Sequence, residues 1–200
     1  LLLERWGDAA GMPAEGALES VVECGATGET SRVSEPFRVL SLPMADSLDA
    51  ALRAFTHHRE TLHGANVWRS GASLQQRITP ARSFKSMRIA KWPPGGVALH
   101  LKRFDNGGRK RAGPVDLPLR WGGRRLAAAV LHHGAGLAGG HYTALVRGND
   151  SESESETWYH CNDASISRVD GGDNEVRARA RHAYLALYLP AADSSLEWWR

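Results

Sequence analysis

The chain has 200 residues, of which 42% are hydrophobic, and a formal net charge of +3. This length and composition are typical of one soluble globular domain, or a large piece of one, with enough apolar residues to bury a core. The small charge, with scattered basic residues and no interleaved aromatic and basic strand, argues against a nucleic-acid-binding domain, and no run approaches the roughly 18 apolar residues that cross a bilayer.

One segment has the helical spacing of apolar residues. If residues 47–55 are helical, the apolar side chains at 48, 51, 52 and 55 fall on one face, and either Asp46 or Ser47 can cap the first turn. Other apolar segments are short, punctuated by Gly or Pro, and rich in β-branched or aromatic residues, which predicts strands. In chain order, the predicted strands are residues 20–24, 36–42, 84–92, 96–104, 126–134, 141–147, 157–162 and 182–189.

Helical and irregular segments complete the predicted organisation. Residues 173–183 are compatible with a short helix before the last strand. Residues 70–81 and 106–114 have no pattern and predict long loops, and residues 149–156, in which Ser and Glu alternate, predict a solvated loop. The fold class expected from these elements is α+β with protruding hairpins.

The two cysteines, Cys24 and Cys161, are too few for a disulfide framework. Reduced thiols are typical of proteins in a reducing compartment, so we expect a cytoplasmic or nuclear protein.

Two predicted strands, 141–147 and 157–163, can pair as a hairpin across the acidic loop. A register with Arg147 opposite Thr157 brings the first residue of one strand opposite the last residue of the other. Directly opposed residues have Cβ atoms about 5 Å apart on one face of a sheet.

This register predicts a contact for His141. Its partner is Asp163, or Asn162 if the hairpin contains one bulge, and Gly139 and Gly140 precede it. Such a contact orients an imidazole and supports the imidazolium, as a general base serving a nucleophile requires. An isolated histidine at the start of a strand is also common as a structural hydrogen-bonding residue, so the pattern leaves both roles open.

Several motifs carry a resemblance. The histidine segment is GGHYTALVR, and WYHCNDASISRV and AYLALYL follow it. Upstream stand SEPFRVLSLPMADSLDAALRAFTHHRETLHGANVW and VALHLKRF. Together they resemble the ubiquitin-specific protease family, the papain-like cysteine deubiquitinases, in family order from about residue 21 to residue 189.

The resemblance implies a papain-like cysteine peptidase fold. Residues 1–200 would form a partial catalytic domain that contains palm and fingers but not the thumb with its nucleophile box. Within it, residues 18–92 would form the fingers and adjoining palm with a helix at 47–59, residues 93–189 the palm with the histidine box, and residues 190–200 a tail.

The resemblance also implies an activity, hydrolysis of the isopeptide or ester bond at the C-terminal glycine of ubiquitin by a cysteine-type deubiquitinase. The implied partners are ubiquitin and ubiquitinated proteins. His141 would be the general base, Asn162 the residue that orients it, and Asp163 an auxiliary or alternative. Gly140 and Tyr142 would line the channel for the ubiquitin tail. Nothing in the pattern predicts an oligomeric state.

The departures from the family pattern also carry predictions. The family nucleophile lies in a G-N-x-C box that these 200 residues do not contain. We therefore expect the chain to be the C-terminal portion of a catalytic domain, with its nucleophile encoded before Leu1. The alternative is a catalytically inactive module that binds ubiquitin or a partner. Cys161 should point away from the face of Asn162 and act as a buried strand residue.

Many family members hold zinc in the fingers with two C-x-x-C pairs. In this sequence the corresponding positions are Cys24, Thr27, Ser70 and Ser73. Hydroxyl groups bind structural zinc poorly, so we expect no metal and no other cofactor.

Overall fold

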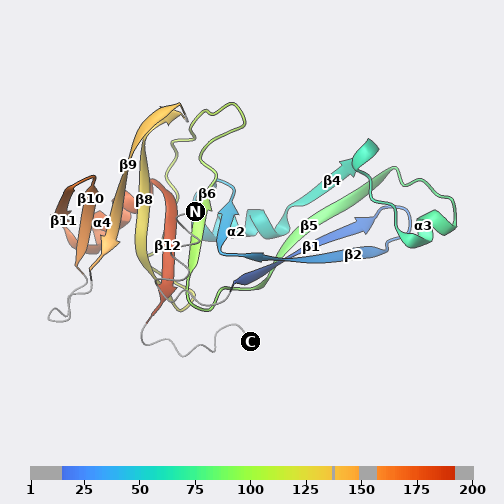
Figure 1. Ribbon diagram of the computed structural model, residues 1–200, viewed down its shortest axis with the longest axis horizontal. Helices are drawn as coiled ribbons and strands as arrows, with labels where there is room; N and C mark the ends of the chain where they lie inside the picture. The colour runs from blue at the N-terminus through green and yellow to red at the C-terminus, as the bar shows by residue number, and fades with distance from the viewer. Residues whose placement is uncertain (1–14, 137, 149–156, 192–200) are drawn as a thin grey trace. The chain divides into compact units, whose positions relative to one another are not determined.

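A computed structural model describes residues 15–136, 138–148 and 157–191 (Figure 1). The predicted acidic loop 149–156 lies outside the described residues, as does most of the predicted tail. Among the described residues, no helix has the length and apolar character needed to cross a membrane.

The chain divides into two compact units. Glu15–Arg38 and Arg53–Pro93 form the first, which we call the finger unit. Val39–Leu52 and the described residues from Pro94 onward form the second, the palm unit.

The finger unit contains one antiparallel sheet with the strand order β2-β1-β5-β4. Its elements are β1 (Gly16–Cys24), β2 (Thr30–Phe37), β4 (Arg59–His63), the 3-10 helix η1 (Gly64–Asn66), α3 (Gly71–Gln75) and β5 (Arg82–Lys91). The prediction of a structureless loop over residues 70–81 is wrong at α3. Ser70 caps this helix by accepting a hydrogen bond from the Ser73 amide, and five residues are too few to display a helical period.

The palm unit contains an eight-stranded sheet with the order β11-β10-β9-β8-β12-β6-β3, in which β7 also pairs with β8. Its strands are β3 (Val39–Leu42), β6 (Val97–Leu101), β7 (Arg120–Trp121), β8 (Arg124–Gly136), β9 (Gly139–Arg147), β10 (Trp158–Asn162), β11 (Ser165–Arg168) and β12 (Ala183–Pro190). The pairing of β3 with β6 is parallel, and the other neighbouring strands pair antiparallel.

Two predicted helices are confirmed. Helix α2 (Leu48–His57) begins after Ser47, whose hydroxyl accepts a hydrogen bond from the Ala50 amide. Its apolar residues Leu48 and Ala51 are fully buried. Helix α4 (Gly172–Ala180) lies between β11 and β12 in the chain and ends before the predicted limit at residue 183. Two sheets with few helices confirm the predicted α+β class.

The core of the palm unit explains why its apolar segments are strands. Strands β6 and β8 bury apolar side chains, among them Leu99, Leu101 and Leu126, and Leu145 of β9 is also fully buried. The predicted single strand over residues 36–42 is instead split at Arg38, because its two ends belong to different sheets.

Two of the strands that the sequence did not predict, β4 and β11, are mostly exposed. All four residues of β11 and four of the five residues of β4 are exposed. Strands without a buried face show no alternation of apolar and polar residues, so the pattern that identifies a strand is absent from them.

A buried arginine joins distant parts of the palm unit. Arg103 is 1% exposed, and within the described part of the chain its hydrogen bonds go to backbone carbonyls. Nε bonds the Ala183 oxygen at 2.6 Å, Nη1 the Gly113 oxygen at 2.7 Å and the Arg111 oxygen at 3.3 Å, and Nη2 the Arg181 oxygen at 2.8 Å. The guanidinium thus ties the loop after β6 to the junction of α4 and β12.

Replacing this guanidinium should destabilise the palm unit. Arg103→Met keeps much of the side-chain volume but leaves four carbonyl oxygens without their charged donor, so we expect the free energy of unfolding to fall by about 3 kcal/mol in urea denaturation. Arg168→Met, on the exposed strand β11, is the matched control and should change it by less than about 0.5 kcal/mol. A loss at Arg103 no larger than that of the control would contradict this role.

Candidate active site

Three neighbouring strands of the palm unit, β8, β9 and β10, carry the predicted site. Strand β9 pairs with β10 so that Arg147 lies opposite Trp158 and Ala144 lies opposite Cys161. The predicted register, with Arg147 opposite Thr157, is therefore wrong by one residue. The ladder ends at the Ala144–Cys161 pair, so His141 has no directly opposed residue among the described residues of β10.

The contact of His141 is formed diagonally instead. Nε2 of His141 lies 2.5 Å from Oδ1 of Asn162 and 3.8 Å from Oδ2 of Asp163. The structure thus brings together the three predicted catalytic residues, with Asn162 as the hydrogen-bonded partner. The His141 side chain is 45% exposed, so the imidazole remains open to a reactant.

The hydrogen bond also determines which nitrogen of His141 is basic. An amide oxygen only accepts hydrogen bonds, so Nε2 carries the hydrogen and donates it to Asn162. Nδ1 of the neutral ring is then the atom with a free electron pair. This is the nitrogen that can take a proton from a nucleophile while Asn162 supports the resulting imidazolium.

A tight turn holds Asn162 in place. Asn162 pairs with Ser165 of β11, and Asp163 and Ala164 form the two-residue connection. Asp163 has a φ of 50°, a region that Asp and Asn adopt more readily than other residues with a side chain. The Asp163 side chain is 81% exposed, which leaves it a weaker partner of His141 than Asn162.

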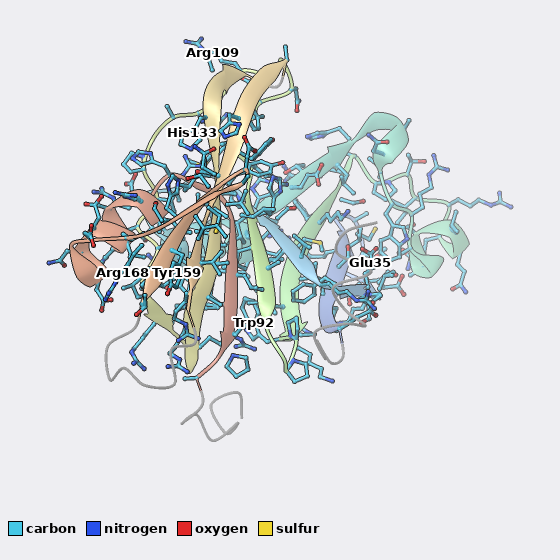
Figure 2. The ribbon with its side chains drawn as sticks, turned by 60° about the vertical axis from the view of Figure 1, so that its left-hand side comes forward. Glu35, Trp92, Arg109, His133, Tyr159 and Arg168 are labelled. Atoms are coloured by element: carbon cyan, nitrogen blue, oxygen red, sulfur yellow. The ribbon has the colours of Figure 1, made fainter. Side chains whose placement is uncertain are left out.

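Strand β8 adds a histidine that the sequence analysis missed. His133 lies directly opposite His141, with ring centroids 6.4 Å apart, and its Nε2 lies 2.8 Å from Oγ1 of Thr143. Figure 2 shows His133 below the tip of the β8–β9 hairpin, where Arg109 lies. Burial, followed by the nearby His141, lowers the pKa of His133. The signal in the sequence was the pair of histidines just before the turn of this hairpin.

The predicted substrate residues lie on the other face of β9. Tyr142, directly opposite His132, is 50% exposed and its ring centroid is 4.8 Å from that of His132. A Cβ atom on Gly140 would overlap the His132 ring and lie 2.5 Å from the His133 carbonyl oxygen, so only glycine fits there. Phe104 also contacts the His132 ring, edge to face at 5.2 Å. The roles of Gly140 and Tyr142 in a substrate channel stay predictions.

Cys161 does not face His141. It lies opposite Ala144 on β9 and opposite Ile166 on β11, whereas its neighbour Asn162 reaches His141. Successive strand residues point to opposite faces, so the thiol points away from the imidazole. We expected Cys161 to be buried, but the structure shows it only half-buried.

In the finger unit, the four residues at positions corresponding to the family's zinc ligands lie close together. Oγ1 of Thr27 lies 2.9 Å from Oγ of Ser70, and Ser70 accepts a hydrogen bond from the Ser73 amide. Cys24, Ser70 and Ser73 are at most 1% exposed. Burial raises the pKa of the Cys24 thiol, but hydrogen bonds from Thr27, from the Ala26 and Thr27 backbone and from Ser70 outweigh it and lower the pKa from 9.0 to about 6.

A metal at this cluster would have one thiolate ligand. Among the described residues, no group of three or more His, Cys, Asp or Glu side chains is arranged to hold a metal ion. A set of one thiolate and three hydroxyls suits structural zinc poorly. The absence of a cofactor stays a prediction.

Comparisons with known proteins give relatives for nearly the whole chain. Residues 123–188 match the family model described as ubiquitin carboxyl-terminal hydrolase. Ubiquitin carboxyl-terminal hydrolase 44 of Danio rerio is 31% identical over an alignment of 228 positions. The alignment covers 91% of this chain and 31% of that protein. Ubiquitin carboxyl-terminal hydrolase 3 of Homo sapiens is 28% identical, with coverage of 87% and 37%. The chain thus spans about a third of the length of these curated relatives.

A solved structure is also similar. It is a SAGA DUB module of Ubp8, Sgf11, Sus1 and Sgf73 bound to monoubiquitin, at a TM-score of 0.70 and 25% identity. The similarity covers 89% of this chain and 41% of that chain. It confirms the expected papain-like fold.

The thiolate character of Cys24 can be measured. In a Cys161→Ser background, the ultraviolet absorbance of the remaining thiolate should titrate with a midpoint of about 6 rather than 9.0. The folded pKa is lowered, so the stability that the thiolate contributes is fully present above the unfolded pKa and is lost as the pH falls through about 6. A midpoint near the ordinary thiol value would show that the hydroxyl and amide donors do not stabilise the thiolate.

The arrangement of the four side chains can be tested with zinc. Thr27→Cys, Ser70→Cys and Ser73→Cys together would give four thiols at zinc-site spacing, and this triple variant should bind one zinc per chain. Metal analysis of the unmodified protein should find no stoichiometric zinc. Adding Cys24→Ser to the triple variant is the control and should weaken retention of the metal, whereas a tightly held zinc in the unmodified protein would refute the prediction.

Proposed function

Because this chain belongs to the ubiquitin-specific protease family and covers a portion of its catalytic domain, we propose that it supplies the general base and its orienting residue to a cysteine-type deubiquitinase. The observation that carries the proposal is the hydrogen bond from Nε2 of His141 to Oδ1 of Asn162. It leaves Nδ1 as the basic atom on an exposed imidazole.

In the proposed reaction, Nδ1 of His141 takes the proton of a cysteine thiol. The thiolate attacks the carbonyl carbon of the C-terminal glycine of ubiquitin, and the imidazolium returns the proton to the leaving amine or alcohol of the isopeptide or ester bond. An acyl-enzyme forms, and His141 then activates the water that releases ubiquitin. Asn162 keeps the imidazole oriented throughout, and Asp163 adds negative charge close to it.

The nucleophile of this proposal is a cysteine outside these 200 residues. Cys161 points away from His141, and Cys24 has no exposed surface and accepts several hydrogen bonds. Neither thiol is therefore available to a substrate at His141. By this proposal, the chain on its own is inactive.

The family likeness also leaves room for a second candidate, a catalytically inactive module that binds ubiquitin or another partner. The bond between His141 and Asn162 supports the enzyme, since a binding module has no need of an oriented base. In either case the proposed ligands are ubiquitin and ubiquitinated proteins, no cofactor is involved, and the compartment is cytoplasmic or nuclear.

The full-length protein that contains this chain separates the two candidates. It should hydrolyse a fluorogenic amide of ubiquitin, and His141→Ala should lower kcat/KM by about 10²- to 10⁴-fold, because the thiol loses its general base. Ubiquitin binding, measured by calorimetry, should persist in this variant. Asn162→Ala should cost less activity than His141→Ala, because it misorients the base without removing it.

A matched control is His58→Ala, which changes an exposed histidine of the finger unit. Its turnover should equal that of the unmodified protein. Full activity of the His141→Ala variant would contradict the role of His141 as general base. Ubiquitin binding without turnover by the unmodified full-length protein would establish the second candidate.

A further inference from the structure

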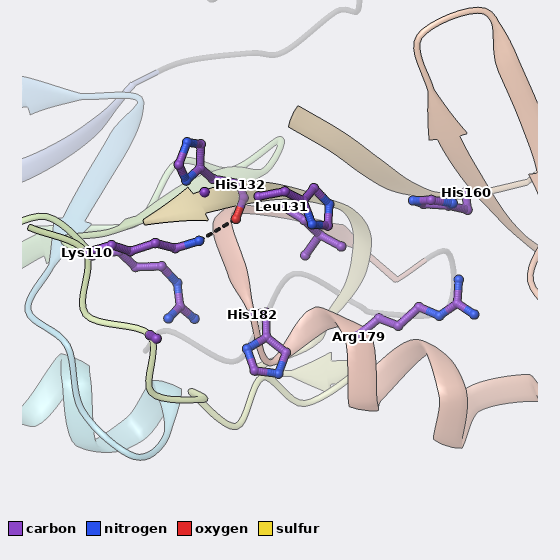
Figure 3. A pocket seen from close by; sticks show the side chains of 10 residues that line it. Lys110, Leu131, His132, His160, Arg179 and His182 are labelled. Atoms are coloured by element: carbon purple, nitrogen blue, oxygen red, sulfur yellow. Dashed lines mark hydrogen bonds between the residues drawn. The ribbon is translucent and has the colours of Figure 1, made fainter. Parts of the chain in front are cut away.

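The palm unit contains a pocket that the proposed reaction does not use. It has a volume of about 630 Å³, within the usual range for a small-molecule site. Figure 3 shows Lys110 on one side of this space and Arg179 and His160 on the other, with His182 between them. The basic residues that surround it come from the loop after β6, from β8, from β10, from α4 and from the α4–β12 junction, and they are Arg103, Lys110, His132, His133, His160, Arg179 and His182.

The positive charge of this pocket is largely uncompensated. No acidic residue is among the described residues that line it. Arg103 donates to backbone carbonyls, and Lys110 donates through Nζ to the His132 carbonyl oxygen at 2.5 Å. Of the described side chains that line the pocket, only Arg179 has a carboxylate partner, Glu175, at 2.6 Å. A buried and a half-buried cation therefore face the same space beside backbone oxygens, an arrangement that favours an anion.

Two histidines of the pocket offer further donors. The imidazoles of His160 and His182 form no hydrogen bond with the described residues, and both line the pocket. Partial desolvation of the exposed His182 ring, followed by the charges of Arg103, Arg181 and Lys110, lowers the pKa of this histidine. An anion in the pocket would offset this repulsion and let both rings donate hydrogen bonds.

The same imidazoles do not form a metal site. Among the residues that the structure describes, no three His, Cys, Asp or Glu side chains are grouped to hold a metal ion. The neighbouring Lys110 and Arg103 would also repel a cation.

We propose that this pocket binds a small polyanion of the phosphate class. Its size exceeds that of a single carboxylate, and its donors converge from several directions, as a ligand with several anionic oxygens requires. The site lies beside the candidate base, because His133 lines the pocket and is directly opposite His141. Binding itself does not depend on the proposed protease activity.

Calorimetric titration with inorganic tripolyphosphate tests the site in the full-length protein at constant ionic strength. We expect one saturable equivalent per chain. His160→Gln and His182→Gln should each raise Kd about tenfold, because each removes one charge-assisted hydrogen bond. His182→Glu places a carboxylate in the pocket and should raise Kd further than His182→Gln.

Two controls make the result specific. His58→Gln changes an exposed histidine of the finger unit and should leave Kd unchanged. Since His182 is exposed, His182→Glu should keep the circular dichroism spectrum and melting temperature of the unmodified protein. A heat signal no different from that of potassium chloride at matched ionic strength would overturn the proposal, and so would unchanged binding by the folded His182→Glu variant.

Discussion

The register of β8, β9 and β10 is the constraint on which the candidate site depends. It sets His133 directly opposite His141. The β9–β10 ladder ends at the Ala144–Cys161 pair, just before Asn162, so the Asn162 side chain reaches the His141 imidazole diagonally across the two strands. Side chains alternate between faces along a strand, so a shift of one residue would carry His141 to the other side of the sheet. The positive φ of Asp163 closes the turn that holds Asn162 at the end of its strand.

This alternation gives β8 and β9 two faces with different side chains. His141 and His133 share one face, whereas the cationic pocket is lined by both His133 and His132. On the other face, Tyr142 lies beside the ring of His132, which Phe104 contacts edge to face. A proton acceptor and an aromatic surface are thus carried by adjacent residues of one strand.

Arg103 connects the fold to the electrostatics of the pocket. A buried cation is costly without partners, and this one is stabilised by the carbonyl oxygens that accept its hydrogen bonds. Carbonyl dipoles satisfy its donors but leave its net charge in place. Desolvation is the main cause of the lowered pKa of Lys110 and of His182, and the positive charge of Arg103 lowers both further.

Much of the fold was predictable from local patterns. Helix α2 and the strands that bury apolar side chains followed from periodicity, whereas the structure decided that Ser47 rather than Asp46 caps the helix. Strands β4 and β11 were not predicted, because they expose most of their side chains. The β9–β10 register was predicted one residue away from its position. The spacing of the two strands allows either pairing, and the structure selects the one in which the buried Trp158 lies opposite Arg147.

The sequence by itself determined the residue types of the candidate site and the separation of His141 and Asn162 by one hairpin. It also determined that hydroxyl residues, and not cysteines, accompany Cys24 at the positions corresponding to zinc ligands. Only the tertiary structure decided which nitrogen of His141 is bonded and that His133 lies opposite it. It alone also brought Arg103 to Ala183, 80 residues along the chain, and assembled the basic pocket. The physical reason is that sequence spacing constrains neighbours within a few residues. Contacts between distant segments depend on the order of strands, and here β12 enters the sheet between β8 and β6.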